Sequence, residues 1–94
     1  MPLIKKEVII KNSQGLHARP AAMFVQIAAK YNAHVNIQKG DEKVNGKSIM
    51  GILTLGAQHN SKVILEADGD DAEAMLNDLE KLLTSEAVKW KNLS

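Results

Sequence analysis

The spacing of apolar residues changes several times along this chain of 94 residues, and that alternation limits the fold more than any other feature. Short β-branched or alternating runs are typical of strands, whereas a spacing of three or four residues is typical of a helix with one buried stripe. These patterns predict strands over Lys5–Lys11, Ala33–Gln38, Glu42–Val44 and Ser61–Ala67, helices over Ala18–Tyr31 and Asp71–Leu83, and a short helix opened by Ser48 and closed by Gly56.

The order of these elements, β-α-β-β-α-β-α, points to two layers. Each helix carries one apolar stripe and the sheet has one apolar face, so the two sets bury their apolar sides most economically against each other. We therefore expect an α+β fold, a two-layer open-faced sandwich with a small antiparallel four-stranded sheet and three helices on one face. Residues 1–94 should form a single domain, with 85–94 as a loose tail or an extra turn.

The stripes also predict which helical side chains face the core. The first helix should bury Ala18, Ala21, Ala22, Val25, Ala28 and Ala29, with Phe24 and Ile27 widening the stripe. The last helix should bury Ala72, Met75, Leu76, Leu79, Leu82 and Leu83. In the short helix, we expect an inward face and an outward Met50, the inward residues being Ile49, Ile52 and Leu53.

Composition excludes several classes of function. The chain has no cysteine, which removes disulfides and thiolate metal sites and fits a reducing, cytoplasmic setting. A net charge of +1, scattered lysines and few aromatic residues leave neither an electrostatic footprint nor a stacking surface for nucleic acid. No apolar run approaches a membrane-spanning length, and the N-terminus lacks the apolar core of an export signal. We expect no nucleic-acid binding, membrane insertion, metal or cofactor.

The run from Gly15 to Ala22 carries the residues best suited to chemistry. It holds the only arginine, Arg19, shortly after His17, where a strand-like pattern gives way to a helical one. A neutral imidazole is a nucleophile, a helix start offers unpaired N–H groups and a positive dipole end, and a guanidinium holds phosphate oxygens in a planar fork. We interpret His17 as the acceptor of a phosphoryl group whose oxygens are held by the Arg19 side chain and the backbone N–H groups of Ala18 and Arg19.

Two segments resemble the signatures of one known family. Gly15–Ala21 (GLHARPA) is similar to the active-site motif of HPr, the histidine-containing phosphocarrier protein of the bacterial phosphoenolpyruvate-dependent sugar phosphotransferase system. Val44–Gly51 (VNGKSIMG) resembles the regulatory serine region of the same family, and the two motifs lie at the family's separation. The predicted element order up to Leu83 is also that of the family. The tail beyond Leu83, with Trp90, is longer than usual, and Gly46 stands where we expect a residue with a side chain.

The resemblance implies a phosphoryl carrier rather than an enzyme. A kinase called enzyme I would phosphorylate Nδ1 of His17 at the expense of phosphoenolpyruvate, and the protein, as a monomer, would pass the group to the IIA domains of sugar permeases. A dedicated HPr kinase/phosphorylase would phosphorylate Ser48, which slows the cycle and signals to a catabolite-control transcription factor. Partners would dock on an apolar patch, which the resemblance maps onto Ala22, Ile49, Met50 and Leu53.

Each of these residues also has a purely structural interpretation. Ser48 is a good N-cap for the short helix, and Met50 could fill a core. Arg19 could be an ordinary surface charge, although a cation in the first turn of a helix is disfavoured by the dipole. His34 and His59 are interpreted as solvated residues on a strand face and in a turn.

Three alternative functions remain open at this point. The first is a regulatory relative that is phosphorylated but serves no sugar permease and signals in carbon or nitrogen control. The second is a small α+β ligand-binding or RNA-binding domain, which the composition disfavours. The third is an enzyme with His17 as general base, for which no acid partner lies near in the sequence and a domain of this size leaves little room for a closed pocket.

Overall fold

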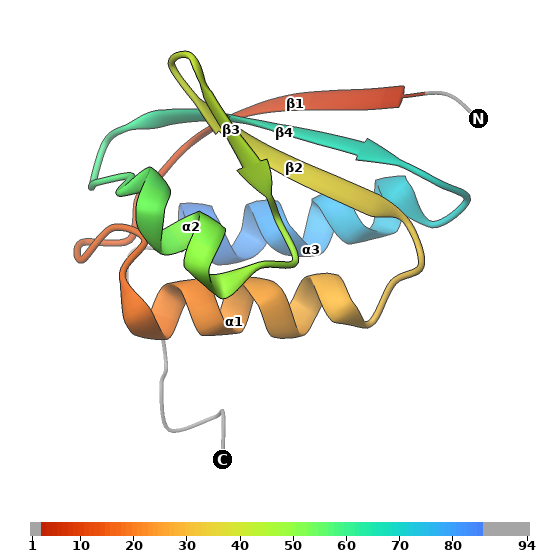
Figure 1. Cartoon of the computed structure of the whole chain (residues 1–94), viewed down its shortest axis with the longest axis horizontal. Coiled ribbons are helices and arrows are strands. Elements are labelled where there is room, and N and C mark those ends of the chain that lie inside the picture. Colours follow the sequence, from red (N-terminus) through yellow and green to blue (C-terminus); the bar gives the residue numbers. More distant parts are fainter. Residues whose placement is uncertain (1–2, 86–94) are drawn as a thin grey trace.

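The computed structural model describes residues 3–85 and shows the predicted order of elements (Figure 1). The described strands are β1 (Leu3–Ile9), β2 (His34–Lys39), β3 (Glu42–Asn45) and β4 (Lys62–Asp68). The described helices are α1 (Ala18–Ala29), α2 (Ile49–Leu55) and α3 (Ala72–Thr84). The predicted boundaries agree with these to within two residues, and the tail predicted over 85–94 lies outside the described residues apart from Ser85.

The four strands form one antiparallel sheet in the order β1-β4-β2-β3. The central strand β4 pairs with β1 through Val8 and Val63, and with β2 through Ile37 and Leu65. The three helices lie on one face of this sheet and leave the other open (Figure 1). The predicted two-layer, open-faced α+β sandwich is therefore confirmed.

The core lies between the two layers and is almost entirely aliphatic. All six residues predicted for the stripe of α3 are buried, and they meet the inward residues of the sheet, which include Val35, Ile37, Val63, Leu65 and Ala67. Phe24 of α1 is fully buried and is the largest side chain of this core. Burial of such a ring contributes about 1.5–3 kcal/mol, so Phe24 is a principal anchor between α1 and the sheet.

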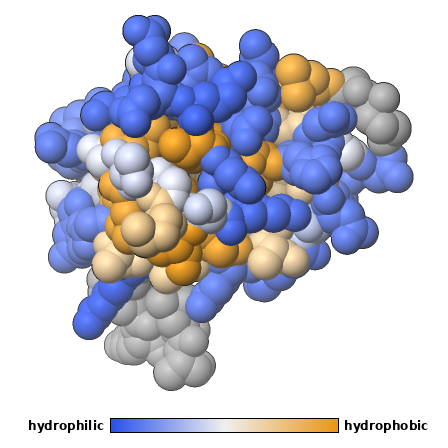
Figure 2. Space-filling model, viewed as in Figure 1, coloured by the Kyte–Doolittle hydropathy of each residue, from blue (hydrophilic) through white to orange (hydrophobic). Residues whose placement is uncertain are grey.

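The inward face predicted for α2 is partly wrong. Ile52 is fully buried and Met50 is exposed at 72%, both as predicted. Ile49 and Leu53, which were predicted to face inward, are exposed at 42% and 36%. The helix has only seven residues, and its buried residues, Ile52 and Leu55, lie three apart on one stripe, which turns the other apolar residues outward. Figure 2 shows the resulting apolar patch over α2 and α1, with hydrophilic side chains around it.

Two alanines of α1 are also exposed where burial was predicted. Ala28 is fully buried, but Ala29, the next residue, lies about 100° further round the helix and faces solvent. Ala18 is the first residue of α1 and is exposed as well. The buried stripe is therefore narrower than predicted and consists of Pro20, Ala21, Phe24 and Ala28.

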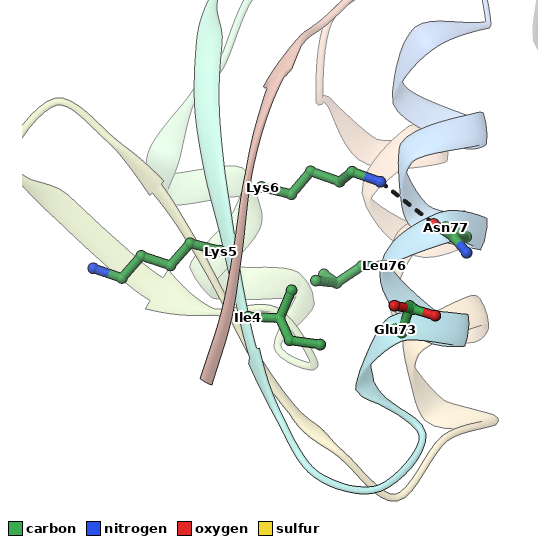
Figure 3. A pocket seen from close by; sticks show the side chains of 6 residues that line it. All are labelled: Ile4, Lys5, Lys6, Glu73, Leu76 and Asn77. Atoms are coloured by element: carbon green, nitrogen blue, oxygen red, sulfur yellow. Dashed lines mark hydrogen bonds between the residues drawn. The ribbon is translucent and has the colours of Figure 1, made fainter. Parts of the chain in front are cut away.

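A pocket of about 260 Å³ lies between β1 and the first half of α3 (Figure 3). Its lining combines Ile4 and Leu76 with polar residues. One of these, Lys6 of β1, places its ammonium group 3.3 Å from Asn77 Oδ1 and 2.9 Å from Glu80 Oε1, both on α3. This volume is below the ~300–1,000 Å³ usual for small-molecule sites. The pocket therefore gives no support to the ligand-binding alternative, and neither β1 nor α3 carries a predicted site residue.

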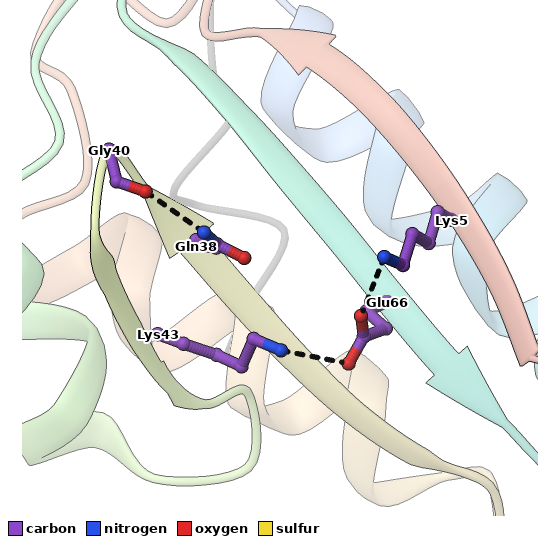
Figure 4. Close-up of polar contacts among 5 residues, drawn as sticks. All are labelled: Lys5, Gln38, Gly40, Lys43 and Glu66. Carbon is purple, nitrogen blue, oxygen red and sulfur yellow. Dashed lines mark hydrogen bonds and ion pairs between the residues drawn. The ribbon is translucent and has the colours of Figure 1, made fainter.

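The open face of the sheet is polar (Figure 4). Glu66 of β4 lies between two ammonium groups, those of Lys5 on β1 at 3.5 Å and Lys43 on β3 at 3.3 Å. The hydrogen bond from Lys43 lowers the pKa of Glu66 below its ordinary value. These charges suit a face in contact with water, so the sheet needs no second helical layer.

Gly46 fixes the connection between β3 and α2, and the expectation of a side chain here is wrong. Gly46 is buried, and its N–H donates to the carbonyl oxygen of Val35 at 2.8 Å. A Cβ atom at this position would lie 2.8 Å from Val35 Cγ1 and 3.2 Å from Phe24 Cε1. Only glycine lets the backbone pass this close to Val35 and Phe24. Gly46 therefore holds the start of α2, where Ser48 lies, against the core.

Candidate functional site

His17 lies at the N-cap position of α1 with an exposed side chain. Its backbone is extended, and its carbonyl oxygen accepts the first helical hydrogen bond, from Ala21 N–H at 2.8 Å. The His17 side chain caps none of the first-turn amides, and this turn of the helix contains no acidic residue. No carboxylate of the first turn therefore offsets the positive end of the α1 dipole, which favours an anion at this helix start.

The first turn of α1 contains the other residues predicted for phosphoryl contact. Ala18 and Arg19 follow His17 directly, and both are exposed. Pro20 has no amide hydrogen and starts the helix without loss of a hydrogen bond, as predicted. The cation of Arg19 thus stands at the end of the helix where the dipole disfavours it, which fits a side chain placed to meet an anion.

The loop before His17 is held by Asn12, Gly15 and Leu16. Asn12 is 4% exposed; its Oδ1 accepts the Gln14 N–H and its backbone oxygen accepts the Gly15 N–H, both at 3.0 Å. Gly15 has a positive φ of 69°, and a Cβ atom there would lie 2.8 Å from the Ala57 oxygen. The same oxygen accepts the Leu16 N–H at 2.8 Å. The chain therefore enters His17 from a fixed direction.

Sequence reasoning missed the residue that contacts the His17 ring and the residue that holds the loop before it. Gln14 Oε1 lies 3.1 Å from His17 Nε2. The sequence indicated only a turn over Asn12–Gly15, and the side-chain roles of Asn12 and Gln14 depend on how that turn closes. The one available signal was the asparagine itself, because Asn often bonds the backbone N–H two residues later.

The second predicted site lies at the start of α2. Ser48 is the N-cap, as predicted, and its Oγ accepts the Gly51 N–H at 3.0 Å. Gly56 ends the helix in the left-handed conformation, with a φ of 61°. Because α1 and α2 pack against each other, His17 and Ser48 stand at the starts of two neighbouring helices.

The residues predicted for docking lie on these two helices. Ile49, Met50 and Leu53 form the exposed apolar patch of α2, and Ala22 of α1 is half-buried. Single exposed apolar side chains are ordinary, but three on a seven-residue helix form a contiguous patch of the kind found at protein interfaces.

Across residues 3–85, no helix is long and apolar enough to cross a membrane.

The fold and the site together define a small open-faced α+β sandwich that presents an exposed histidine at the start of one helix and an apolar patch on the helix packed against it.

Comparison with known proteins identifies the family. Residues 4–85 match the family described as the PTS HPr component phosphorylation site. The phosphocarrier protein HPr of Borreliella burgdorferi is 37% identical over 83 residues, which cover 88% of this chain and 96% of that protein. The phosphocarrier protein HPr of Neisseria meningitidis is 45% identical over 74 residues, covering 78% and 83%.

A solved structure agrees with the sequence relatives. The crystal structure of an HPr from Bacillus anthracis superposes with a TM-score of 0.84 at 40% identity, covering 86% of this chain and 96% of that one. The chain therefore belongs to the HPr family of the phosphotransferase system.

Proposed function

We propose that this protein is a phosphocarrier that accepts a phosphoryl group from enzyme I on His17 and passes it to the IIA domains of sugar permeases. The observation that carries the proposal is the exposed His17 at the N-cap of α1, whose side chain caps no amide, with Arg19 in a first turn that contains no acidic residue. Membership of the HPr family and the relatives that bear the name phosphocarrier protein support it.

The proposed reaction is an in-line displacement at phosphorus. The neutral His17 ring forms a nitrogen–phosphorus bond while the bond from phosphorus to the donor breaks, and the electron pair of that bond leaves with the donor. Charge spreads over the phosphoryl oxygens, so positioning and electrostatic stabilisation supply most of the rate. The N–H groups of Ala18 and Arg19, the dipole of α1 and the Arg19 guanidinium provide that stabilisation.

The exposure of the site suits a carrier better than an enzyme. A group that must leave again is held best by a few contacts, because a carrier that stabilises its phosphorylated form too well cannot give the group away. His17, Ala18 and Arg19 are all exposed, so a partner can approach the histidine directly and complete the site with its own residues. This arrangement disfavours a general-base enzyme, which needs an enclosed substrate.

The patch of Ala22, Ile49, Met50 and Leu53 is proposed as the docking surface for enzyme I and the IIA domains. Ser48 stands directly before this patch. Phosphorylation of Ser48 by an HPr kinase/phosphorylase would place about two negative charges beside apolar contact residues, which a partner tolerates poorly. A catabolite-control transcription factor would bind the protein in this form, with Ser48 phosphorylated.

A regulatory relative without a permease would use the same residues, and its phosphorylation would look identical. Only onward transfer of the phosphoryl group separates the two functions.

Phosphoryl uptake tests the proposal. The purified protein is incubated with phosphoenolpyruvate and enzyme I of an HPr-containing bacterium, and its intact mass is measured. We expect one acid-labile phosphoryl group per chain, lost in His17→Ala and retained in His34→Ala and His59→Ala. Uptake of an acid-labile phosphoryl group by His17→Ala would refute the site.

A further inference from the structure

We propose that Gln14 is a positioning residue that holds the His17 ring in one tautomer, with the proton on Nε2 and the lone pair on Nδ1. This inference rests on the proposed function, because it explains which nitrogen receives the phosphoryl group and why that nitrogen is ready to react.

The first step is the contact itself. The Gln14 amide oxygen Oε1 faces His17 Nε2 at 3.1 Å. A carbonyl oxygen can only accept a hydrogen bond, so Nε2 must be the donor in this contact. A neutral imidazole has one N–H, and therefore Nδ1 is left unprotonated with its lone pair available as the nucleophile.

The second step is the rigidity of the residues that make the contact. The Gln14 N–H is bound to Oδ1 of Asn12, which is buried, and Gly15 closes the turn back onto Asn12. After Gln14, the Leu16 N–H donates to the Ala57 carbonyl oxygen, and the His17 carbonyl oxygen accepts the Ala21 N–H of α1. Because both backbones are fixed before the side chains meet, the hydrogen bond costs less ordering than one between two mobile surface residues.

The third step is the change in this hydrogen bond during phosphoryl transfer. The lone pair of Nδ1 forms the bond to phosphorus, the donor leaves with the electron pair of the broken bond, and Nε2 keeps its proton. The ring thereby gains positive charge. The bond from Nε2–H to Gln14 becomes charge-assisted, and such bonds are roughly twice as strong as neutral ones. Since Gln14 binds the reacting ring more tightly than the resting ring, it also speeds phosphorylation.

The test compares the wild type with three variants. Gln14→Met keeps the length of the side chain and removes the amide oxygen, whereas Gln14→Glu keeps an accepting oxygen. Gln26→Met makes the same exchange at an exposed position of α1 and serves as the matched control. Gln14 is exposed, so all three variants should fold, and thermal unfolding verifies this.

The primary readout is the tautomer of His17, measured from the ring nitrogen chemical shifts of ¹⁵N-labelled protein at a pH where the ring is neutral. We expect the Nε2–H form to dominate in the wild type, Gln26→Met and Gln14→Glu. In Gln14→Met, the ratio of Nε2–H to Nδ1–H should fall by about two- to tenfold, the range expected for one lost hydrogen bond. An unchanged ratio in Gln14→Met, or a dominant Nδ1–H form in the wild type, would overturn the proposal.

The second readout is phosphoryl uptake from enzyme I, with the linkage assigned by NMR. Gln14→Met should accept the group about two- to tenfold more slowly than Gln26→Met, and a wild-type phosphoryl group on Nε2 would contradict the assignment. The failure of the proposed function looks different. In that case the wild type accepts no phosphoryl group at all, whatever tautomer its His17 adopts.

Discussion

At the scale of single residues, the position of His17 costs stability and favours chemistry. It occupies an N-cap position, where serine, threonine or aspartate would normally satisfy the first amides, and its side chain leaves those amides uncapped. A histidine here forgoes about 1 kcal/mol of capping stability. Its gain is a ring placed next to amide donors and the positive end of α1, which fits a residue retained for chemistry.

Arg19 should act on the rate of transfer and hardly on the fold. Arg19→Ala should slow transfer to and from His17 by about tenfold or more, because the guanidinium meets oxygens whose charge changes during the reaction. Arg19→Lys keeps the charge but loses the fork and should lie between the wild type and Arg19→Ala. Rapid-quench measurement of both directions of transfer checks this.

The same Arg19 variants should unfold normally, within about 0.5 kcal/mol of the wild type, because the side chain is exposed. If Arg19→Ala transferred the group at the wild-type rate, Arg19 would have no part in the mechanism.

Residues whose role follows from a local pattern could be identified in the sequence, and residues defined by a folded contact could not. His17, Arg19 and Ser48 sit at helix starts that capping and periodicity signals mark. Asn12 and Gln14 act only through the closed turn that brings their side chains to the backbone and the ring.

At the scale of elements, α2 combines a structural cap with the proposed regulatory site. Ile49 and Leu53 were mispredicted as buried, because seven residues offer too few turns for periodicity to separate two stripes. The longer α3, with thirteen residues, was predicted correctly along its whole stripe.

Substitutions at Ser48 should separate stability from docking. Ser48→Ala removes the oxygen that accepts the Gly51 N–H, so it should lower the free energy of unfolding by about 1 kcal/mol and leave phosphorylation of His17 unchanged. Ser48→Asp keeps a good N-cap but places a charge beside Ile49 and Met50. It should therefore unfold like the wild type and accept the phosphoryl group more slowly.

Chemical denaturation and single-turnover kinetics on the same preparations check both effects. Equal transfer rates for Ser48→Asp and the wild type would leave Ser48 as a helix cap alone.

At the scale of the whole molecule, polar contacts tie the end of α1 to α3 and to the segment before α2. Asp71, at the N-cap of α3, accepts the N–H groups of Asn32 and Ala33 at 2.9 Å each. The Tyr31 hydroxyl donates to Asp78, which is the main reason that the pKa of Tyr31 is raised. Lys47 Nζ donates to the Tyr31 carbonyl oxygen at 2.8 Å. These contacts were not predictable, because their partners are far apart in the sequence.

Asp71 should make the free energy of unfolding depend on pH in the acid range. The hydrogen bond from Asn32 N–H is the main cause that lowers the pKa of Asp71 in the folded state. A lowered folded pKa stabilises the fold above the ordinary aspartate value of about 4, and this stabilisation is lost as the pH falls through the lowered value. Asp71→Ala should therefore be less stable than the wild type at pH 7, and the difference should shrink below about pH 4.

Thermal unfolding from neutral to acid pH checks this, with Asp70→Ala, at the exposed neighbouring residue, as the control. The account of Asp71 fails if the two variants differ from the wild type by the same amount at every pH.

The predicted sandwich followed from periodicity because each element has one apolar side and the two-layer arrangement buries all of them. The strand order β1-β4-β2-β3 was not predicted, since pairing depends on contacts between distant segments. Gly46 was misjudged for the same reason, as its role depends on Val35 and Phe24.

Onward transfer tests the central claim most directly. The protein is labelled on His17 by enzyme I and radioactive phosphoenolpyruvate, purified away from both, and mixed with a IIA domain of a sugar permease. We predict that the label leaves this chain and appears on the IIA domain in equal amount. A label that stays on His17 while a known HPr of similar size delivers its own to the same IIA domain would contradict the carrier function.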